Sequence, residues 1–173
     1  YASEIIDVFG ARLEREKTKD RSVPADECFE AIPYDFSRLH QSMQNSGDVL
    51  IAKALEWHRT DPRLGQYKSG RFVAIMFPGL PDAIINELIA YAKSNDRGAQ
   101  HFVIDVMSNY LGADISFTVL KEMVAVLPQD DELLPRIRSA LVTTGVMHGE
   151  FGYRNTLIAK REKLQNWITE SRD

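Results

Sequence analysis

The 173-residue chain has one cysteine, Cys28, and lacks several features that define common protein classes. A single cysteine cannot close an internal disulfide and cannot supply a multi-cysteine zinc site, so we expect a cytoplasmic protein. No apolar run approaches the roughly 18 residues that a membrane-spanning helix requires. No Gly-Lys dipeptide occurs in the sequence, which excludes the phosphate-binding loop of nucleotide hydrolases.

Positive charge is also in short supply. The chain carries 21 Lys and Arg against 25 Asp and Glu, a net charge of −4. Residues 1–36 hold five basic and nine acidic side chains, residues 37–112 eight and seven, and residues 113–173 eight and nine. Because nucleic acids are attracted by a basic surface, this distribution disfavours nucleic-acid binding. The first residue is Tyr1 and not Met, so we expect a domain of a longer protein.

Helical periodicity dominates the chain, and strand alternation is nearly absent. Ile5, Ile6 and Phe9 recur at helical spacing and predict a first helix over residues 2–17. Residues 18–36 contain two prolines and only scattered apolar side chains, as is typical of a long connection. We therefore predict an N-terminal helix and loop over residues 1–36 and a helical domain over residues 37–173.

Within the helical domain, caps and apolar faces predict a succession of helices. The expected ranges are 37–45, 48–60, 72–77, 83–93, about 97–112, 114–127, 130–145 and 153–170. The expected inward faces include Val49, Ile51 and Leu55 in the second of these helices, Phe102, Val103, Val106 and Met107 in the fifth, and Val126 in the sixth. The predicted fold class is all-α, with about eight to ten helices in total.

The spacing of three aspartates is the most informative pattern. Asp48, Asp82 and Asp114 lie 34 and 32 residues apart, and each is expected to cap the first helix of a pair. When the three segments are aligned on these aspartates, two sets of apolar residues coincide: Ile51, Ile85 and Phe117, and then Trp57, Tyr91 and Met123. One helix pair cannot cover its own apolar side, so this period predicts antiparallel helical hairpins stacked into a short α-solenoid.

The hairpin period over about residues 37–170 resembles HEAT and armadillo repeats. The segment Thr144–Tyr153, followed by Arg161 and Trp167, resembles the tail of HEAT-like regions in large bacterial multidomain proteins. This resemblance implies a helical-repeat scaffold and not a particular activity.

Candidate chemistry is sparse. His148 and Glu150 form the His-x-Glu pair of zinc deaminases, but the Pro-Cys-x-x-Cys part of that signature is missing. The glycines around this pair favour a structural loop. A small hydrolase that uses His148 and Glu150 is kept as a minor alternative.

The remaining polar candidates have structural explanations. We expect His58 to cap a helix end, His40 and His101 to be structural, and Cys28 to be buried as a small apolar residue. Asp130, Asp131 and Glu132 fit the positive end of a helix dipole. The basic group Lys160, Arg161 and Lys163 is interrupted by Glu162 and is typical of a solvated face. No catalytic, cofactor-binding or metal-ligating residue is predicted.

Our first hypothesis is a non-enzymatic α-solenoid that binds another protein, or other domains of its own chain, through exposed residues of the second helices. The alternative is a nucleic-acid-acting HEAT-like domain, since that fold class also includes DNA glycosylases. Such a domain would need a basic groove with aromatic side chains.

Overall fold

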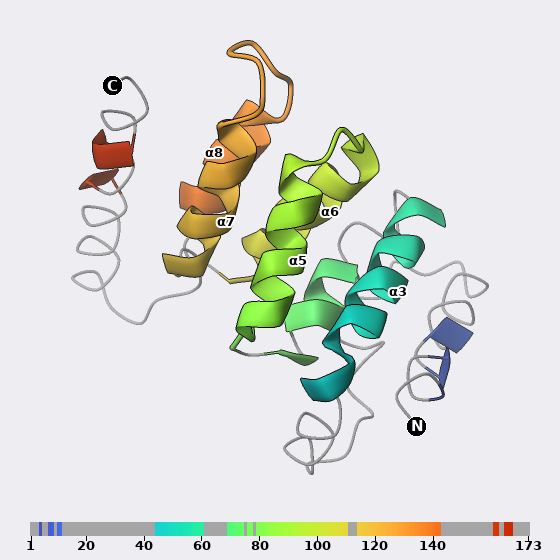
Figure 1. Cartoon of the computed structure of the whole chain (residues 1–173). Coiled ribbons are helices and arrows are strands. Elements are labelled where there is room, and N and C mark those ends of the chain that lie inside the picture. Colours follow the sequence, from blue (N-terminus) through green and yellow to red (C-terminus); the bar gives the residue numbers. More distant parts are fainter. Residues whose placement is uncertain are drawn as a thin grey trace, which may run out of the picture.

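The computed structural model describes residues 4, 7, 8, 10, 11, 44–60, 69–74, 76, 77, 79–110, 114–142, 161, 162 and 165–167. All regular structure in these residues is helical, which confirms the all-α fold class. The elements are η2 (Gln44–Ser46), α3 (Gly47–Thr60), α5 (Asp82–Lys93), α6 (Arg97–Ser108), α7 (Asp114–Val124) and α8 (Leu134–Val142) (Figure 1). Residues 69–74 and 76 are helical as well.

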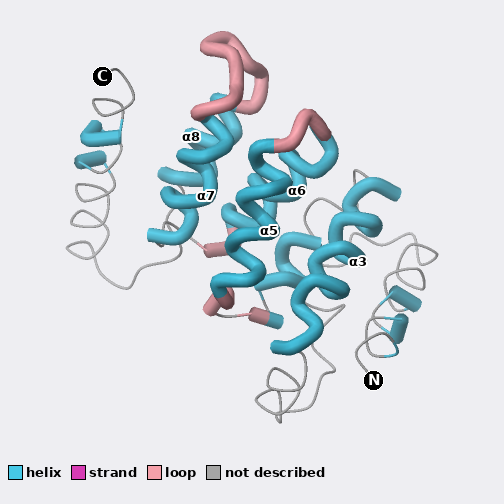
Figure 2. The backbone as a smooth tube through the Cα atoms, in the orientation of Figure 1, coloured by secondary structure: helices cyan, strands magenta, loops and turns pink. Residues whose placement is uncertain are grey.

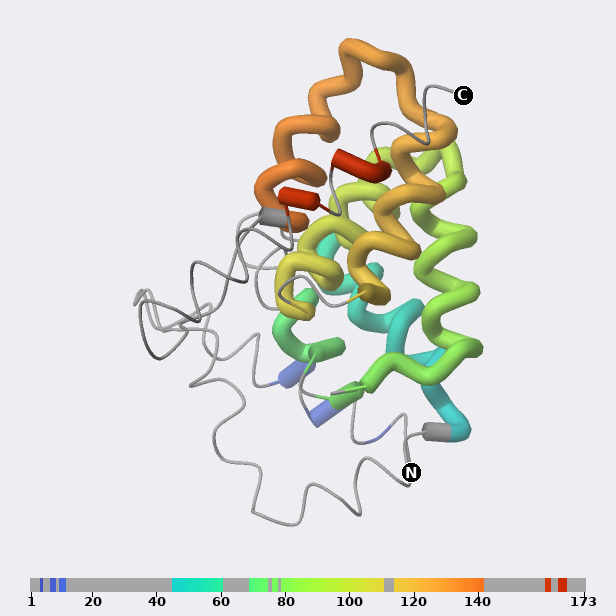
Figure 3. Tube along the Cα trace, turned by 90° about the vertical axis from the view of Figure 1, so that its left-hand side faces the viewer, coloured from blue at the N-terminus to red at the C-terminus, as the bar shows by residue number. Residues whose placement is uncertain are grey.

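The helices form two layers. α5 packs between α3 and α7 in one layer, while α6 contacts α8 in the other (Figure 2). Viewed from the side, α5 and α7 lie on one side of the molecule and α6 and α8 on the other (Figure 3). Short connections, residues 94–96 and 125–133, join α5 to α6 and α7 to α8. The described helices are therefore stacked antiparallel pairs, as the sequence predicts.

Local chemistry sets the ends of the central pair. Pro81, with φ −65°, precedes α5, where its fixed φ suits a helix entrance. Ser94 ends α5, because its N–H and its hydroxyl both donate to the Tyr91 carbonyl, at 3.2 and 2.7 Å. Asp96 then begins α6 by accepting a hydrogen bond from the Ala99 N–H at 3.1 Å. The tight turn between α5 and α6 follows from these two caps.

α6 lies at the centre of the core. Its contacts reach α3, α5, α7 and α8. Five residues are predicted to line this helix. Phe102, Val103, Val106 and Met107 are fully buried, whereas Tyr110, just after the helix, is only partly buried. The strength of the apolar period in this helix made its inward face predictable.

The aspartate alignment finds the repeat but places its inward face one residue too late. The positions buried in all three first helices come two and six residues after each aspartate: Leu50, Ile84 and Ser116, then Ala54, Leu88 and Leu120. At the position chosen from the sequence, three residues after the aspartate, Ile51 is buried but Ile85 and Phe117 are only half-buried. The hairpins thus present equivalent faces to the core, in a slightly rotated register.

Two kinds of prediction are corrected here. Asp48 is the second residue of α3, and Asp82 and Asp114 are the first residues of α5 and α7, so the three aspartates lie in first turns and not at cap positions. An acid in a first turn still interacts favourably with the helix dipole. Val49 and Val126 were expected to face inward, but each is 47% exposed. Leu50 is buried in place of Val49.

Both ends of the stack have a tryptophan contact. On the α3 side, the helical residue Gly10 approaches Trp57 so closely that a Cβ there would lie 3.3 Å from the indole Cζ2. Gly10 of the predicted N-terminal helix therefore packs against α3. On the α7–α8 side, Trp167 packs against the core. The boundary at residues 36 and 37 stays a prediction, because residues 12–43 lie outside the described residues.

Candidate functional sites: a polar cluster and an apolar groove

A cluster of five polar side chains lies between the first and last helical pairs. His58 comes from α3, Ser69 from the helical residues 69–74, His101 and Asp105 from α6, and Arg136 from α8. Arg136 Nη2 donates to Asp105 Oδ1 at 3.0 Å, and Arg136 Nη1 lies 2.5 Å from His101 Nδ1. We call these five residues the polar cluster.

His58 faces the interior, because it follows Leu50 and Ala54 at intervals of four residues on the buried face of α3. Its side chain is 4% exposed, and its ring packs edge-on against Phe102 with centroids 5.7 Å apart. Nδ1 lies 3.4 Å from Ser69 Oγ and 3.7 Å from Asp105 Oδ2. The prediction that His58 caps the helix end is therefore wrong. Burial lowers the pKa of His58 to about 4, so the ring is neutral at pH 7.

Asp105 has two oxygens in different surroundings. Oδ1 binds Arg136, whereas Oδ2 is buried and accepts no hydrogen bond from the described part of the chain. Burial raises the pKa of Asp105 to about 6, although Arg136 acts in the opposite direction. A buried carboxylate oxygen that accepts no hydrogen bond costs free energy, and this cost favours the protonated form of Asp105.

The cluster contains a serine, a histidine and an aspartate, but not in the geometry of a nucleophilic triad. In a triad the serine faces Nε2 of the histidine and the aspartate faces Nδ1. Here Ser69 and Asp105 both face Nδ1 of His58, and Ser69 is fully buried. The arrangement joins helices and does not form a hydrolytic site in this conformation.

The sequence pattern did not indicate that Ser69 lies beside His58 and Asp105. A signal for part of the cluster was present: Asp105 and Arg136 are 31 residues apart, close to the hairpin period. Opposite charges at that spacing lie on neighbouring second helices.

Ion pairs between neighbouring hairpins follow the same period. Arg59 of α3 binds Asp96, and Arg97 of α6 binds Asp131 through two contacts of 3.0 and 2.5 Å. Asp131 also accepts the Leu133 N–H at 2.9 Å, and its side chain is 1% exposed. The helix-dipole explanation is thus incomplete for Asp131, which is a buried partner of Arg97. A sequence signal existed, since Asp61, Asp96 and Asp131 recur at intervals of 35 residues.

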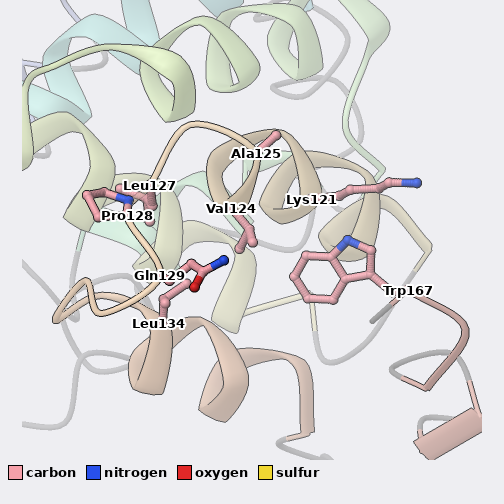
Figure 4. Close-up of a pocket in the computed structure, with 8 residues that line it drawn as sticks. All are labelled: Lys121, Val124, Ala125, Leu127, Pro128, Gln129, Leu134 and Trp167. Carbon is pink, nitrogen blue, oxygen red and sulfur yellow. The ribbon is translucent and has the colours of Figure 1, made fainter. Parts of the chain in front are cut away.

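An apolar groove of about 750 Å³ lies at the connection between α7 and α8. Figure 4 shows the Trp167 ring on one side of the groove, with Leu127 and Pro128 on the other. Val126, which is exposed, adjoins this lining in the sequence. The lining residues are Lys121, Val124, Ala125, Leu127, Pro128, Gln129, Leu134 and Trp167. Trp167 packs on the core and also lines this groove.

The structure does not describe most of the other candidate residues from the sequence. Cys28, His40, His148, Glu150, Lys160 and Lys163 lie outside the described residues, while Arg161 and Glu162 are helical and exposed. The described residues contain no group of three or more His, Cys, Asp or Glu side chains placed to hold a metal ion. In the same part of the chain, no helix combines the length and apolarity needed to cross a membrane.

Comparison with known proteins assigns no family to the chain: no family model, curated protein or solved structure matches it. Any function has to be argued from the residues themselves.

Proposed function

We propose that the chain is a non-enzymatic helical-repeat module of the HEAT or armadillo type, which binds an apolar segment of another polypeptide in the groove between α7, α8 and Trp167. The observation that carries this proposal is the groove itself. It is lined by Val124, Leu127 and Leu134, and Val126 beside it is exposed. Concave sites lined mainly by apolar side chains are where ligands and partner side chains commonly bind. Stacked helical pairs are widely used as binding surfaces.

The groove suits a peptide or helix with apolar side chains better than a charged ligand. Among its described lining residues one side chain is charged, Lys121, which lies at the end of the groove that Trp167 also borders (Figure 4). Apolar anchors inserted between helices are a common mode of helix recognition. The binding partner is therefore expected to contribute apolar side chains, either from a separate protein or from another part of a longer chain.

Three arginines between neighbouring hairpins give the nucleic-acid alternative no support. Arg59, Arg97 and Arg136 each bind a carboxylate of a neighbouring hairpin. Because these carboxylates offset the positive charge, this surface is a weak attractor for phosphates.

The test is affinity capture with the 173-residue chain and two matched variants. Ala125→Arg places a charge in the groove at an exposed position, and Ala52→Arg places the same charge at an exposed position of α3. We expect the wild type and A52R to retain one stoichiometric partner and A125R to lose it, with unchanged helical circular dichroism in all three.

Three results would contradict the proposal. Equal capture by A125R would exclude the groove as the binding site. Release of the captured material by nuclease or moderate salt would favour the nucleic-acid alternative. The proposal would also be contradicted if the wild-type column captured no protein and if no candidate domain, added as a separate polypeptide, bound to the chain.

A further inference from the structure

The contact between Arg136 and His101 constrains the protonation of the histidine. A guanidinium group has only donors, so the Arg136 Nη1 that lies 2.5 Å from His101 Nδ1 must donate to it. Nδ1 can accept only when it carries no proton. The observed geometry therefore requires a neutral His101 with its proton on Nε2.

The same arginine connects two helices through two partners. From α8, Arg136 reaches both His101 and Asp105 on α6, one turn apart. α6 and α8 belong to neighbouring hairpins and pack directly against each other. Arg136 is thus a polar link between the last described hairpin and the rest of the stack.

We propose that the Arg136–His101–Asp105 contact is an acid-sensitive link between α6 and α8, which protonation of His101 opens. A proton on Nδ1 removes the acceptor for Arg136 and places a second cation against the guanidinium. Arg136 then loses one of its two partners on α6, so α8 is held less firmly. No group of the proposed binding groove takes part, and the inference stands independently of the proposed function.

Several groups around the link act on the charge of His101. Burial is the largest influence, and Arg136 and Arg97 add to it, so together they lower the pKa of His101 below 6.5. Glu132 and Asp131, from the connection between α7 and α8, act in the opposite direction. Across the cluster, the charges of His101, Arg136 and Arg59 all act on His58 of α3.

The direction of the pH effect follows from these influences. Because the folded state holds the His101 proton more weakly than the unfolded state, stability is lost as pH falls through 6.5. Asp105 acts in the reverse sense: its pKa is raised to about 6, so the folded state gains stability as pH falls from 6 toward 3.8. The two contributions oppose each other, and a stability profile of the wild type alone does not separate them.

The experiment therefore compares the wild type with His101→Gln. Glutamine offers an amide oxygen as acceptor for Arg136 and does not titrate near neutral pH. The urea midpoints of both proteins are measured at pH 7.5 and pH 5.0. We expect the wild-type midpoint, relative to that of H101Q, to be lower at pH 5.0 than at pH 7.5. An identical pH response of the two proteins would overturn the proposal.

A second measurement does not depend on a variant that folds. The pKa of His101 is measured by NMR titration of the wild-type chain and is expected below 6.5; a value of 6.5 or more would overturn the link. In Arg136→Gln, which removes the cation, the pKa of His101 should rise toward 6.5. A purely structural role for Arg136 would leave that pKa unchanged.

Discussion

At Gly70, the helical segment 69–74 approaches α6 more closely than any side chain would allow. A Cβ there would lie 2.7 Å from the Asp105 carbonyl oxygen and 2.8 Å from its carbonyl carbon. These are backbone atoms within a helix, so they cannot turn aside as the end of a side chain could. Gly70 therefore sets the distance between this segment and α6, and with it the position of Ser69 beside His58.

Gly70→Ala should destabilise the fold by about 1–3 kcal/mol, the range found for overpacked interiors. Gly79 is the matched control, since a Cβ there would meet no atom within 4 Å. Gly79→Ala should change stability by less than about 0.5 kcal/mol. Urea denaturation of both variants checks the difference, and equal midpoints would show that the close approach at Gly70 does not limit packing.

His58 should make the fold sensitive to acid. Its pKa is lowered from 6.5 to about 4, chiefly by burial, so the folded state binds this proton more weakly than the unfolded state. Stability is then lost as pH falls from about 6.5 toward 4. In His58→Gln this component is absent, so the loss of stability between pH 7 and pH 5 should be smaller than in the wild type. A steeper loss in H58Q would contradict a buried, neutral His58.

At the scale of single helices, Asp96 has two separable roles. It accepts the Ala99 N–H as the N-cap of α6, and it binds Arg59 of α3. Both partners of the ion pair are about half exposed, so this pair is expected to contribute little. Asp96→Ala should cost about 1 kcal/mol through loss of the cap, whereas Asp96→Asn, which keeps a capping oxygen, should cost much less. Thermal denaturation of D96A and D96N distinguishes the roles, and equal losses would assign the stability to the ion pair.

The helices themselves could be predicted from the sequence because their signal is local. The apolar period of α6 identified four of its seven buried residues, and the aspartate spacing identified the repeat. The wrong predictions placed the buried face of a helix about one residue away from its actual position. Val49 and Leu50 are both apolar neighbours on α3, and only packing against the next helices decides which of them is buried. An aspartate, similarly, is favourable at a cap and in a first turn, so its identity does not fix the first helical residue.

The candidate sites were much less predictable than the helices. The polar cluster brings His58 together with Asp105, 47 positions further along the chain, and Asp105 together with Arg136. No local pattern encodes such pairs. Trp167 illustrates a different difficulty: an aromatic residue at core spacing can also line a groove, and only the fold shows that it does both.

On the scale of the whole molecule, α6 connects the two layers and all three described hairpins. Phe102 at its centre is fully buried and packs against the ring of His58. Phe102→Ala should cost about 3–5 kcal/mol, the range for a large aromatic removed from a core. The exposed Val49→Ala is the control and should stay within about 0.5 kcal/mol. A loss in F102A no larger than in V49A would contradict the central position of α6.

The stack also explains where binding is expected. On the α3 side Gly10 lies against Trp57, and the other side carries the groove between α7, α8 and Trp167. A partner that inserts apolar side chains into this groove extends the core of the last hairpin. Such a partner should shield the backbone of the groove from solvent without altering the central helices.

Hydrogen exchange of the chain, alone and with its captured partner, is the measurement that tests the binding function most directly. Slower exchange in the bound state is predicted for residues 121–129 and for the first turn of α8, with α3 unchanged. Protection confined to α3 and α5, with no change at residues 121–129, would contradict the assignment of the groove as the binding surface.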